Sequence, residues 1–274
     1  MIDSAQATFK SVFSTKNKAL IKELVITDFK LRYQNSVLGY LWSLLKPLML
    51  FAILYVVFVN VFKIGDAIPH YSVYLLLGIV MWNFFGEMTN LSLGSIVARG
   101  DLIRKISIPR WIIVLSTSLA ALINLTLNLL IVAIFMIVGG VDINQTVIFL
   151  PFIFIFYYLF SLGISLFLAA AFVKFRDLSH IWEVVMQGAF YATPILYPLS
   201  QFDNPFYQKL LLVNPVAYVM QEARYALVTP KTMTVSSVYG SSFAVLIPIA
   251  VAAITFIIGV SYFRSQQKYF AENI

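Results

Sequence analysis

Long apolar segments separated by short polar ones dominate the sequence. Several exceed the roughly 20 residues that a helix rising about 1.5 Å per residue needs to cross a hydrocarbon core about 30 Å thick. A water-soluble domain cannot bury so many continuous apolar positions, so the pattern predicts membrane-spanning helices. We expect six, at residues 43–62, 72–93, 111–138, 147–172, 181–199 and 241–263.

Two further segments are not predicted to cross the membrane. A polar leader of about forty residues precedes the first apolar run, and we expect it to form a cytoplasmic, interfacial helix whose apolar face Asp28 and Arg32 interrupt. The leader is not expected to be a cleaved signal. The stretch 200–240 holds apolar pieces too short to cross. It predicts short re-entrant gate helices between the fifth and sixth spans, with an extracellular loop as the alternative.

The predicted fold class is therefore an all-α polytopic membrane protein in three parts. Residues 1–42 form the cytoplasmic and interfacial N-terminal segment, 43–263 the six-helix transmembrane domain, and 264–274 a cytoplasmic tail. Composition agrees, since 61% of the residues are hydrophobic, 11% are charged and the mean hydropathy is +0.88. This balance is typical of an integral membrane protein.

The basic residues predict the orientation. Of the 19 lysines and arginines, the six-span map places 15 on one side and four on the other. Because basic residues accumulate on the cytoplasmic side of bacterial membranes, both termini are expected in the cytoplasm and the protein in the inner membrane. A seventh crossing at 206–228 would put Arg264 and Lys268 outside, against this rule. Basic loops facing an anionic leaflet explain the net charge of +7 without nucleic acid as a partner.

The sequence lacks the residues that several kinds of metal, catalytic or transport site require. The chain has no cysteine, and His70 and His180 are scattered, so no metal site is expected. The twelve acidic residues form no close pair of the kind that a polytopic membrane enzyme of cell-envelope glycan synthesis would need. No internal repeat is evident, which argues against a secondary transporter. The enzyme nevertheless remains an alternative reading.

One face of the second predicted span is polar. Asn83, Glu87 and Asn90 follow one another at spacings of four and three residues, which places them on one side of a helix. A carboxylate within a span is costly and usually faces a partner group or a water-filled cavity. Pore lining and hydrogen bonding between helices are both consistent with this pattern. Thr117, Asn124 and Asn128 form a similar stripe on the third span, where packing is the favoured reading.

Five motifs carry a resemblance to a known family. They are FKLRYQNSVLGYLWSLLKPL at Phe29–Leu48, DLIRKISIPRW at Asp101–Trp111, VKFRDL at Val173–Leu178, TPILYP at Thr193–Pro198 and NPVAYV at Asn214–Val219. Each motif is short, but their order and the chain length resemble type-2 ABC exporter permeases. The similarity is to the branch that exports O-antigen, capsule, teichoic acid and rhamnan-type wall polysaccharides, and it covers nearly the whole chain.

The resemblance implies several partners. Such permeases form homodimers, bind two copies of a separate nucleotide-binding ATPase subunit and export undecaprenyl-diphosphate-linked polysaccharide. The sequence contains no GxxxxGK[ST] string among its 12 glycines, so ATP and Mg²⁺ are expected on the partner subunit and no cofactor on this chain. The chain itself is not expected to be an enzyme. Another type-2 ABC exporter, of lipid or drug, is the nearer alternative.

The loop between the second and third spans is expected to couple ATPase closure to the spans, because it is short and joins both helix ends. Its apolar residues form a compact face, and its basic residues can meet acidic groups on a partner; the alternative is that the charges only enforce topology. The predicted coupling residues are Asp101, Leu102, Ile103, Arg104, Lys105, Ile106 and Pro109.

Two other groups of residues are predicted to contact substrate or gate its path. Aromatic rings at the presumed cytoplasmic mouth could stack on sugars, although most rings in this chain should face lipid or other helices. The predicted channel residues are Tyr33, Tyr40, Trp42, Asn83, Glu87 and Asn90. Prolines that break the fifth span near the outer surface mark the gate. The predicted gate residues are Pro194, Tyr197, Pro198, Asn214 and Pro215.

Overall fold

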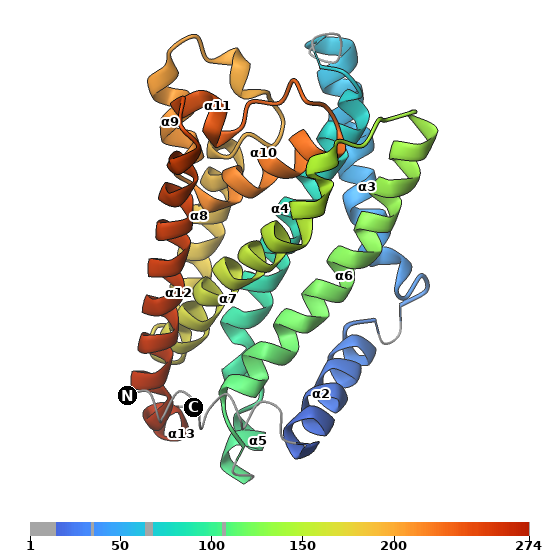
Figure 1. The fold of residues 1–274 in the computed structure, drawn as a ribbon. Coiled ribbons are helices and arrows are strands. Elements are labelled where there is room, and N and C mark those ends of the chain that lie inside the picture. Colours follow the sequence, from blue (N-terminus) through green and yellow to red (C-terminus); the bar gives the residue numbers. More distant parts are fainter. Residues whose placement is uncertain (1–14, 34–35, 64–67, 106–107, 274) are drawn as a thin grey trace.

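The computed structural model describes residues 15–33, 36–63, 68–105 and 108–273. All regular structure in these ranges is helical, which confirms the all-α fold class (Figure 1). Residues 1–14 of the predicted N-terminal segment and Ile274 of the tail lie outside the described residues. The longer helices are α2 (Thr15–Tyr33), α3 (Leu41–Val56), α4 (Tyr71–Ala98), α6 (Trp111–Val138), α7 (Leu150–Lys174), α8 (Leu178–Ala192), α10 (Pro215–Leu227) and α12 (Leu246–Gln266). The shorter ones are η1 (Val57–Val61), α5 (Gly100–Lys105), η3 (Gln145–Phe149), η4 (Leu199–Gln201), α9 (Pro205–Leu212), α11 (Val235–Tyr239), η5 (Ser242–Val245), η6 (Gln267–Tyr269) and α13 (Phe270–Asn273).

Five helical segments of the described chain are long and apolar enough to cross a membrane. The third predicted span is reproduced residue for residue by α6, and α4 continues five residues beyond the predicted end of the second span. The first, fourth and sixth predicted spans also overlap their helices closely. The five segments are Leu41–Val61, Tyr71–Ala98, Trp111–Val138, Gln145–Lys174 and Ser242–Tyr269.

The predicted fifth span differs from the helix found there. Instead of ending at residue 199, α8 ends at Ala192 and has 15 residues, which corresponds to about 22 Å. Thr193 is extended, at φ −105° and ψ 137°, as the residue before a proline prefers to be. Because a bilayer core is about 30 Å thick, the count of six crossings stays a prediction.

The bundle is built around α4. In an apolar stretch of 18 residues within α4, 78% of the residues are buried inside the protein, against 33% or less in the matching stretch of each of the other four segments. It packs along α6 on one side and α7 on another, and α7 packs along α12. The α7–α12 contact is close because two glycines meet there: a Cβ on Gly163 would lie 2.6 Å from Cα of Phe256, and one on Gly259 would collide with the carbonyl oxygen of Gly163. Small residues permit such close helix contacts in membrane proteins.

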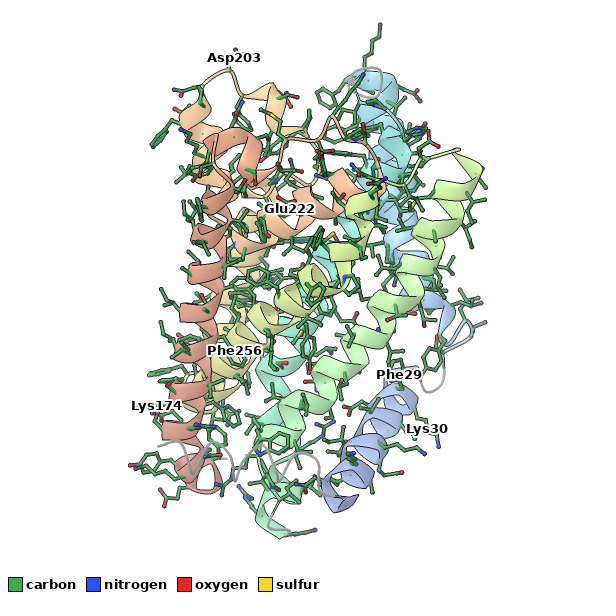
Figure 2. All side chains as sticks on the ribbon, viewed as in Figure 1. Phe29, Lys30, Lys174, Asp203, Glu222 and Phe256 are labelled. Carbon is green, nitrogen blue, oxygen red and sulfur yellow. The ribbon has the colours of Figure 1, made fainter. Side chains whose placement is uncertain are left out.

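The shorter helices gather at the two ends of the bundle. In Figure 1, α2, α5 and α13 lie towards one end, whereas α9, α10 and α11 lie towards the other. Figure 2 shows Lys30 and Lys174 towards the first end and Asp203 at the opposite one. We call α9, α10, α11 and the connecting residues 193–204 the cap. The predicted gate stretch therefore contains short helices, while their re-entry into the membrane stays a prediction.

Candidate functional site

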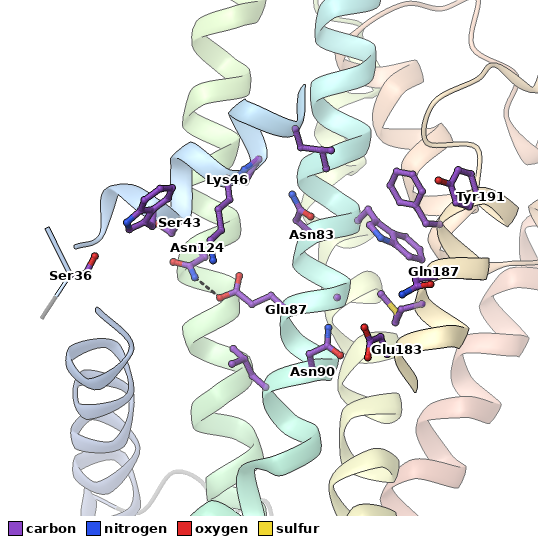
Figure 3. A pocket seen from close by; sticks show the side chains of 18 residues that line it. Ser36, Ser43, Lys46, Asn83, Glu87, Asn90, Asn124, Glu183, Gln187 and Tyr191 are labelled. Atoms are coloured by element: carbon purple, nitrogen blue, oxygen red, sulfur yellow. Dashed lines mark hydrogen bonds between the residues drawn. The ribbon is translucent and has the colours of Figure 1, made fainter. Parts of the chain in front are cut away.

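A cavity of about 1100 Å³ lies between α3, α4, α6 and α8 (Figure 3). Its walls mix amides, hydroxyls and charged groups with aromatic rings. The lining residues are Ser36, Trp42, Ser43, Lys46, Pro47, Leu50, Trp82, Asn83, Gly86, Glu87, Asn90, Leu91, Asn124, Glu183, Met186, Gln187, Phe190 and Tyr191.

Glu87 is positioned in this cavity by a hydrogen bond from a neighbouring helix. Asn124 Nδ2 on α6 donates to Glu87 Oε1 at 2.5 Å, and Asn124 is only 3% exposed. Asn128 Nδ2 donates to the carbonyl oxygen of Asn124 at 2.8 Å, which links the next turn of α6 to the same group. Figure 3 shows the side chain of Lys46 extending from α3 towards Glu87. A carboxylate between helices thereby receives a hydrogen bond from α6.

Aromatic rings form the opposite part of the wall. The Trp82 and Phe190 rings meet edge to face, with centroids 5.9 Å apart, and join α4 to α8. Tyr191, on the next residue of α8, is 70% exposed. Edge-to-face packing fixes the orientation of the two rings. The cavity therefore combines rigid aromatic surfaces with hydrogen-bonding groups.

Four of the six predicted channel residues line this cavity. Trp42, Asn83, Glu87 and Asn90 all do so, although they come from two different helices. Tyr40 does not: its ring stacks on Phe29, with centroids 5.1 Å apart, at the start of α3. Tyr33 is the last residue of α2, and its side chain lies outside the described residues.

The predicted gate residues all lie in or beside the cap. Asn214 caps α10, since its Oδ1 accepts from the Val216 N–H at 3.0 Å, and its Nδ2 donates to Thr193 Oγ1 at 3.2 Å. Pro215 occupies the first turn of α10, where a missing N–H costs nothing. Pro198 precedes η4, and the Tyr197 hydroxyl donates to the carbonyl oxygen of Tyr191 at 2.8 Å. These bonds tie the end of α8 to the start of α10.

Arg224 is the central residue of the cap, and the sequence pattern did not reveal it. Its side chain is fully buried and donates to the carbonyl oxygens of Pro194 at 2.5 Å and Ile195 at 2.7 Å. Two further bonds, of 3.2 and 3.1 Å, reach the carbonyl oxygen of Tyr74 on α4. The guanidinium lies 3.5 Å from the centroid of the Tyr74 ring, a cation–π contact.

The main chain of α4 leaves room for this guanidinium at Gly78. A Cβ there would collide with Arg224 Nη2 and lie 3.1 Å from the carbonyl oxygen of Ile195. Tyr71 adds a parallel tie, since its hydroxyl donates to the carbonyl oxygen of Leu196 at 2.9 Å. Arg224 thus joins α10, the chain after α8 and α4 through backbone carbonyls. Neither Gly78 nor those carbonyls form a sequence motif.

The predicted coupling residues separate into an inward and an outward group. Ile103 is buried and packs in one cluster with Ile96, Ile113 and Phe270, so it stabilises the end of the bundle. Asp101, Arg104 and Lys105 are exposed, Leu102 is half-buried, and Pro109 lies in the turn before α6. Ile106 lies outside the described residues. The exposed surface of α5 is therefore charged rather than apolar.

An ion pair next to α5 connects the N-terminal helix to the bundle. Arg99, at the end of α4, pairs with Asp28 of α2. Its Nη1 also donates to Ser116 Oγ at 3.3 Å and the carbonyl oxygen of Ile113 at 3.4 Å on α6. Asp28, which interrupts the apolar face of the predicted interfacial helix, thus faces the protein rather than water.

A bundle of long apolar helices around a polar cavity is the architecture of a membrane transport protein. The chain belongs to the ABC-2 type transporter family, which it matches over residues 19–228. It is 32% identical over 197 residues to the O-antigen export system permease protein RfbA of Klebsiella pneumoniae, covering 71% of this chain and 75% of the relative. The RfbA protein of Myxococcus xanthus is 29% identical over 204 residues, or 74% and 78% of the two chains. The polysialic acid transport protein KpsM of Escherichia coli is 23% identical over 254 residues, or 92% and 95%.

Proposed function

We propose that this chain is the permease subunit of an ABC exporter that moves a lipid-linked polysaccharide, carried on undecaprenyl diphosphate, across the bacterial inner membrane. The observation that carries the proposal is the cavity beside α4, because membrane proteins keep polar groups within spans where a polar substrate or water passes. The names of the relatives, O-antigen export permeases and a polysialic acid transport protein, support polysaccharide as the cargo.

The proposed assembly contains two copies of this chain and two copies of an ATPase subunit that binds ATP and Mg²⁺. The low burial of two helices that wall the cavity supports a second copy. No residue of α8 is buried, and in an apolar 18-residue stretch of Leu41–Val61 only 11% of the residues are buried. Faces left this open suit contact with another protein surface or with substrate. The conduit is then formed between the two copies, with the cap of each copy as its outer gate.

Filling the cavity tests this function. Asn90→Trp adds a large side chain at an exposed position of the lining, so glycan export should fall by about tenfold, the equivalent of about 1.4 kcal/mol. The amount of complex with the ATPase should not change. Export is measured as surface glycan in cells that make the lipid-linked precursor. The matched control is Ile134→Trp, because Ile134 is 58% exposed on α6 and lies outside the cavity. Normal export by a correctly inserted Asn90→Trp protein would contradict the proposal.

The proposed orientation puts both termini in the cytoplasm. A cysteine placed at Ser179 or Ser265 should resist an impermeant thiol reagent added to intact cells, because both positions lie in regions rich in basic residues. A cysteine at Asn144, in the short connection between α6 and α7, should react. The natural chain has no cysteine, so each labelled band reports one position. Labelling at Ser265 from outside would exclude the six-span arrangement.

A further inference from the structure

The cavity lining carries more negative than positive side chains. One cation, Lys46, faces the space together with two carboxylates, Glu87 and Glu183, and the other lining groups are neutral. Figure 3 shows Lys46 directed towards Glu87, and Glu183 standing apart on α8. Glu183 is exposed on the wall that α8 forms. The formal charge of the lining is negative.

The neutral groups of the lining suit hydroxyl-rich, uncharged ligands. Asn83, Asn90 and Gln187 offer amides that can both donate to and accept from hydroxyls. The exposed faces of aromatic rings suit the apolar faces of sugar rings. A sugar polymer with a carboxylate or phosphate on each unit would instead bring like charges close to Glu87 and Glu183, and like charges brought together repel one another.

We infer that the cavity selects glycans whose repeating units carry no negative charge, and that Glu87 and Glu183 are specificity-determining residues that repel polyanionic glycans. The inference rests on the proposed function, since it assigns a substrate class to the same cavity. It also assigns the cavity to the sugar portion of a lipid-linked substrate, because the diphosphate of the carrier would meet the same repulsion. Discrimination by placing a like charge against the wrong ligand is a common device in proteins.

Binding of two probes tests the inference. The chain and its ATPase partner are reconstituted in lipid nanodiscs and titrated with a neutral hexasaccharide of hexoses or with a hexamer of sialic acid. Because Trp42 and Trp82 line the cavity, their fluorescence reports occupancy. The neutral probe should bind about tenfold or more tightly than the sialic acid hexamer. In Glu87→Gln/Glu183→Gln the ratio should fall towards one, because the sialic acid hexamer gains affinity.

The variants keep the structure and separate the explanations. The Glu87→Gln substitution retains a side-chain oxygen that can accept from Asn124. The single substitution Glu183→Gln, on an exposed face of α8, should give part of the increase in affinity for the sialic acid hexamer. The control Asp142→Asn/Glu272→Gln removes two exposed acidic groups outside the cavity and should leave the ratio unchanged.

Two results would overturn the inference. The first is that the neutral hexasaccharide binds the wild-type complex no more tightly than the sialic acid hexamer does, or does not bind at all. The other is a ratio that does not change in the double variant. If export still falls in Asn90→Trp, only the charge selection is lost; normal export in Asn90→Trp would remove the proposed function itself.

Discussion

Replacement of Arg224 by methionine should detach the cap from α4. The change leaves the buried carbonyl oxygens of Tyr74, Pro194 and Ile195 without their charged donor, and hydrogen bonds to charged groups contribute about 1.5–3 kcal/mol each. The total loss should exceed about 3 kcal/mol, enough to lower the thermal midpoint of the purified protein and to abolish export. Thermal unfolding in detergent and limited proteolysis of the 193–204 connection measure the two effects.

Two further variants show whether the hydrogen-bonding geometry of Arg224 or its charge holds the cap against α4. Arg224→Lys keeps the charge but replaces a planar fork with a point donor, so it should restore only part of the stability. Lys231→Met removes an exposed cation from the same end of the protein and should change stability by less than about 0.5 kcal/mol. A stable, export-competent Arg224→Met protein would show that the Tyr71 hydroxyl and the caps of the short helices suffice to hold the cap.

Reversal of the exposed charges on α5 should uncouple the exporter. Arg104→Glu with Lys105→Glu replaces two exposed cations at the end of the bundle where α2 and α13 also lie. If these cations meet acidic groups of the ATPase, like charges then face one another, and association or export should fall by more than about tenfold. Co-purification of the ATPase, ATP turnover and surface glycan are the three measurements.

The control reverses charge elsewhere at the same end. Lys174→Glu, at the last residue of α7, with Arg176→Glu, in the turn before α8, changes the net charge equally and should leave association with the ATPase intact. Because Ile103 is buried against the bundle, its replacement would act through stability and cannot serve as a docking test. Wild-type association, ATP turnover and export after reversal at Arg104 and Lys105 would exclude α5 as the coupling element.

Helix positions could be predicted from the sequence where a continuous apolar run was bounded by residues that start or end a helix, such as proline, a basic residue or glycine. The span of α6 was predicted residue for residue, because it begins at Trp111 after a proline and a basic residue and ends before Gly139 and Gly140. The fifth span was predicted too long because hydropathy continues through Ile195 and Leu196. Pro194 prevents Thr193 from staying helical, and this local preference ended the helix at Ala192.

Side-chain partners were harder to predict than helices. Polar stripes on the second and third spans were evident separately, yet the sequence could not show that Asn124 meets Glu87, since the contact depends on how α4 and α6 pack. Ile103 illustrates the opposite difficulty: an apolar face on a loop helix suits docking or internal packing equally well, and only the fold decides. Arg224 is one of the four basic residues that the six-span map places on the outer side, and the sequence gives it no other role, because its partners are backbone carbonyls, which every residue has.

The burial of α4 has a consequence for biosynthesis. This helix is the least apolar of the five long segments and the most dependent on neighbours, yet it leaves the ribosome before most of them. Asn124, which donates to Glu87, follows 37 residues later. The carboxylate of Glu87 is therefore synthesised before the amide that donates to it, and this hydrogen bond between α4 and α6 can form only after Asn124 has been added to the chain.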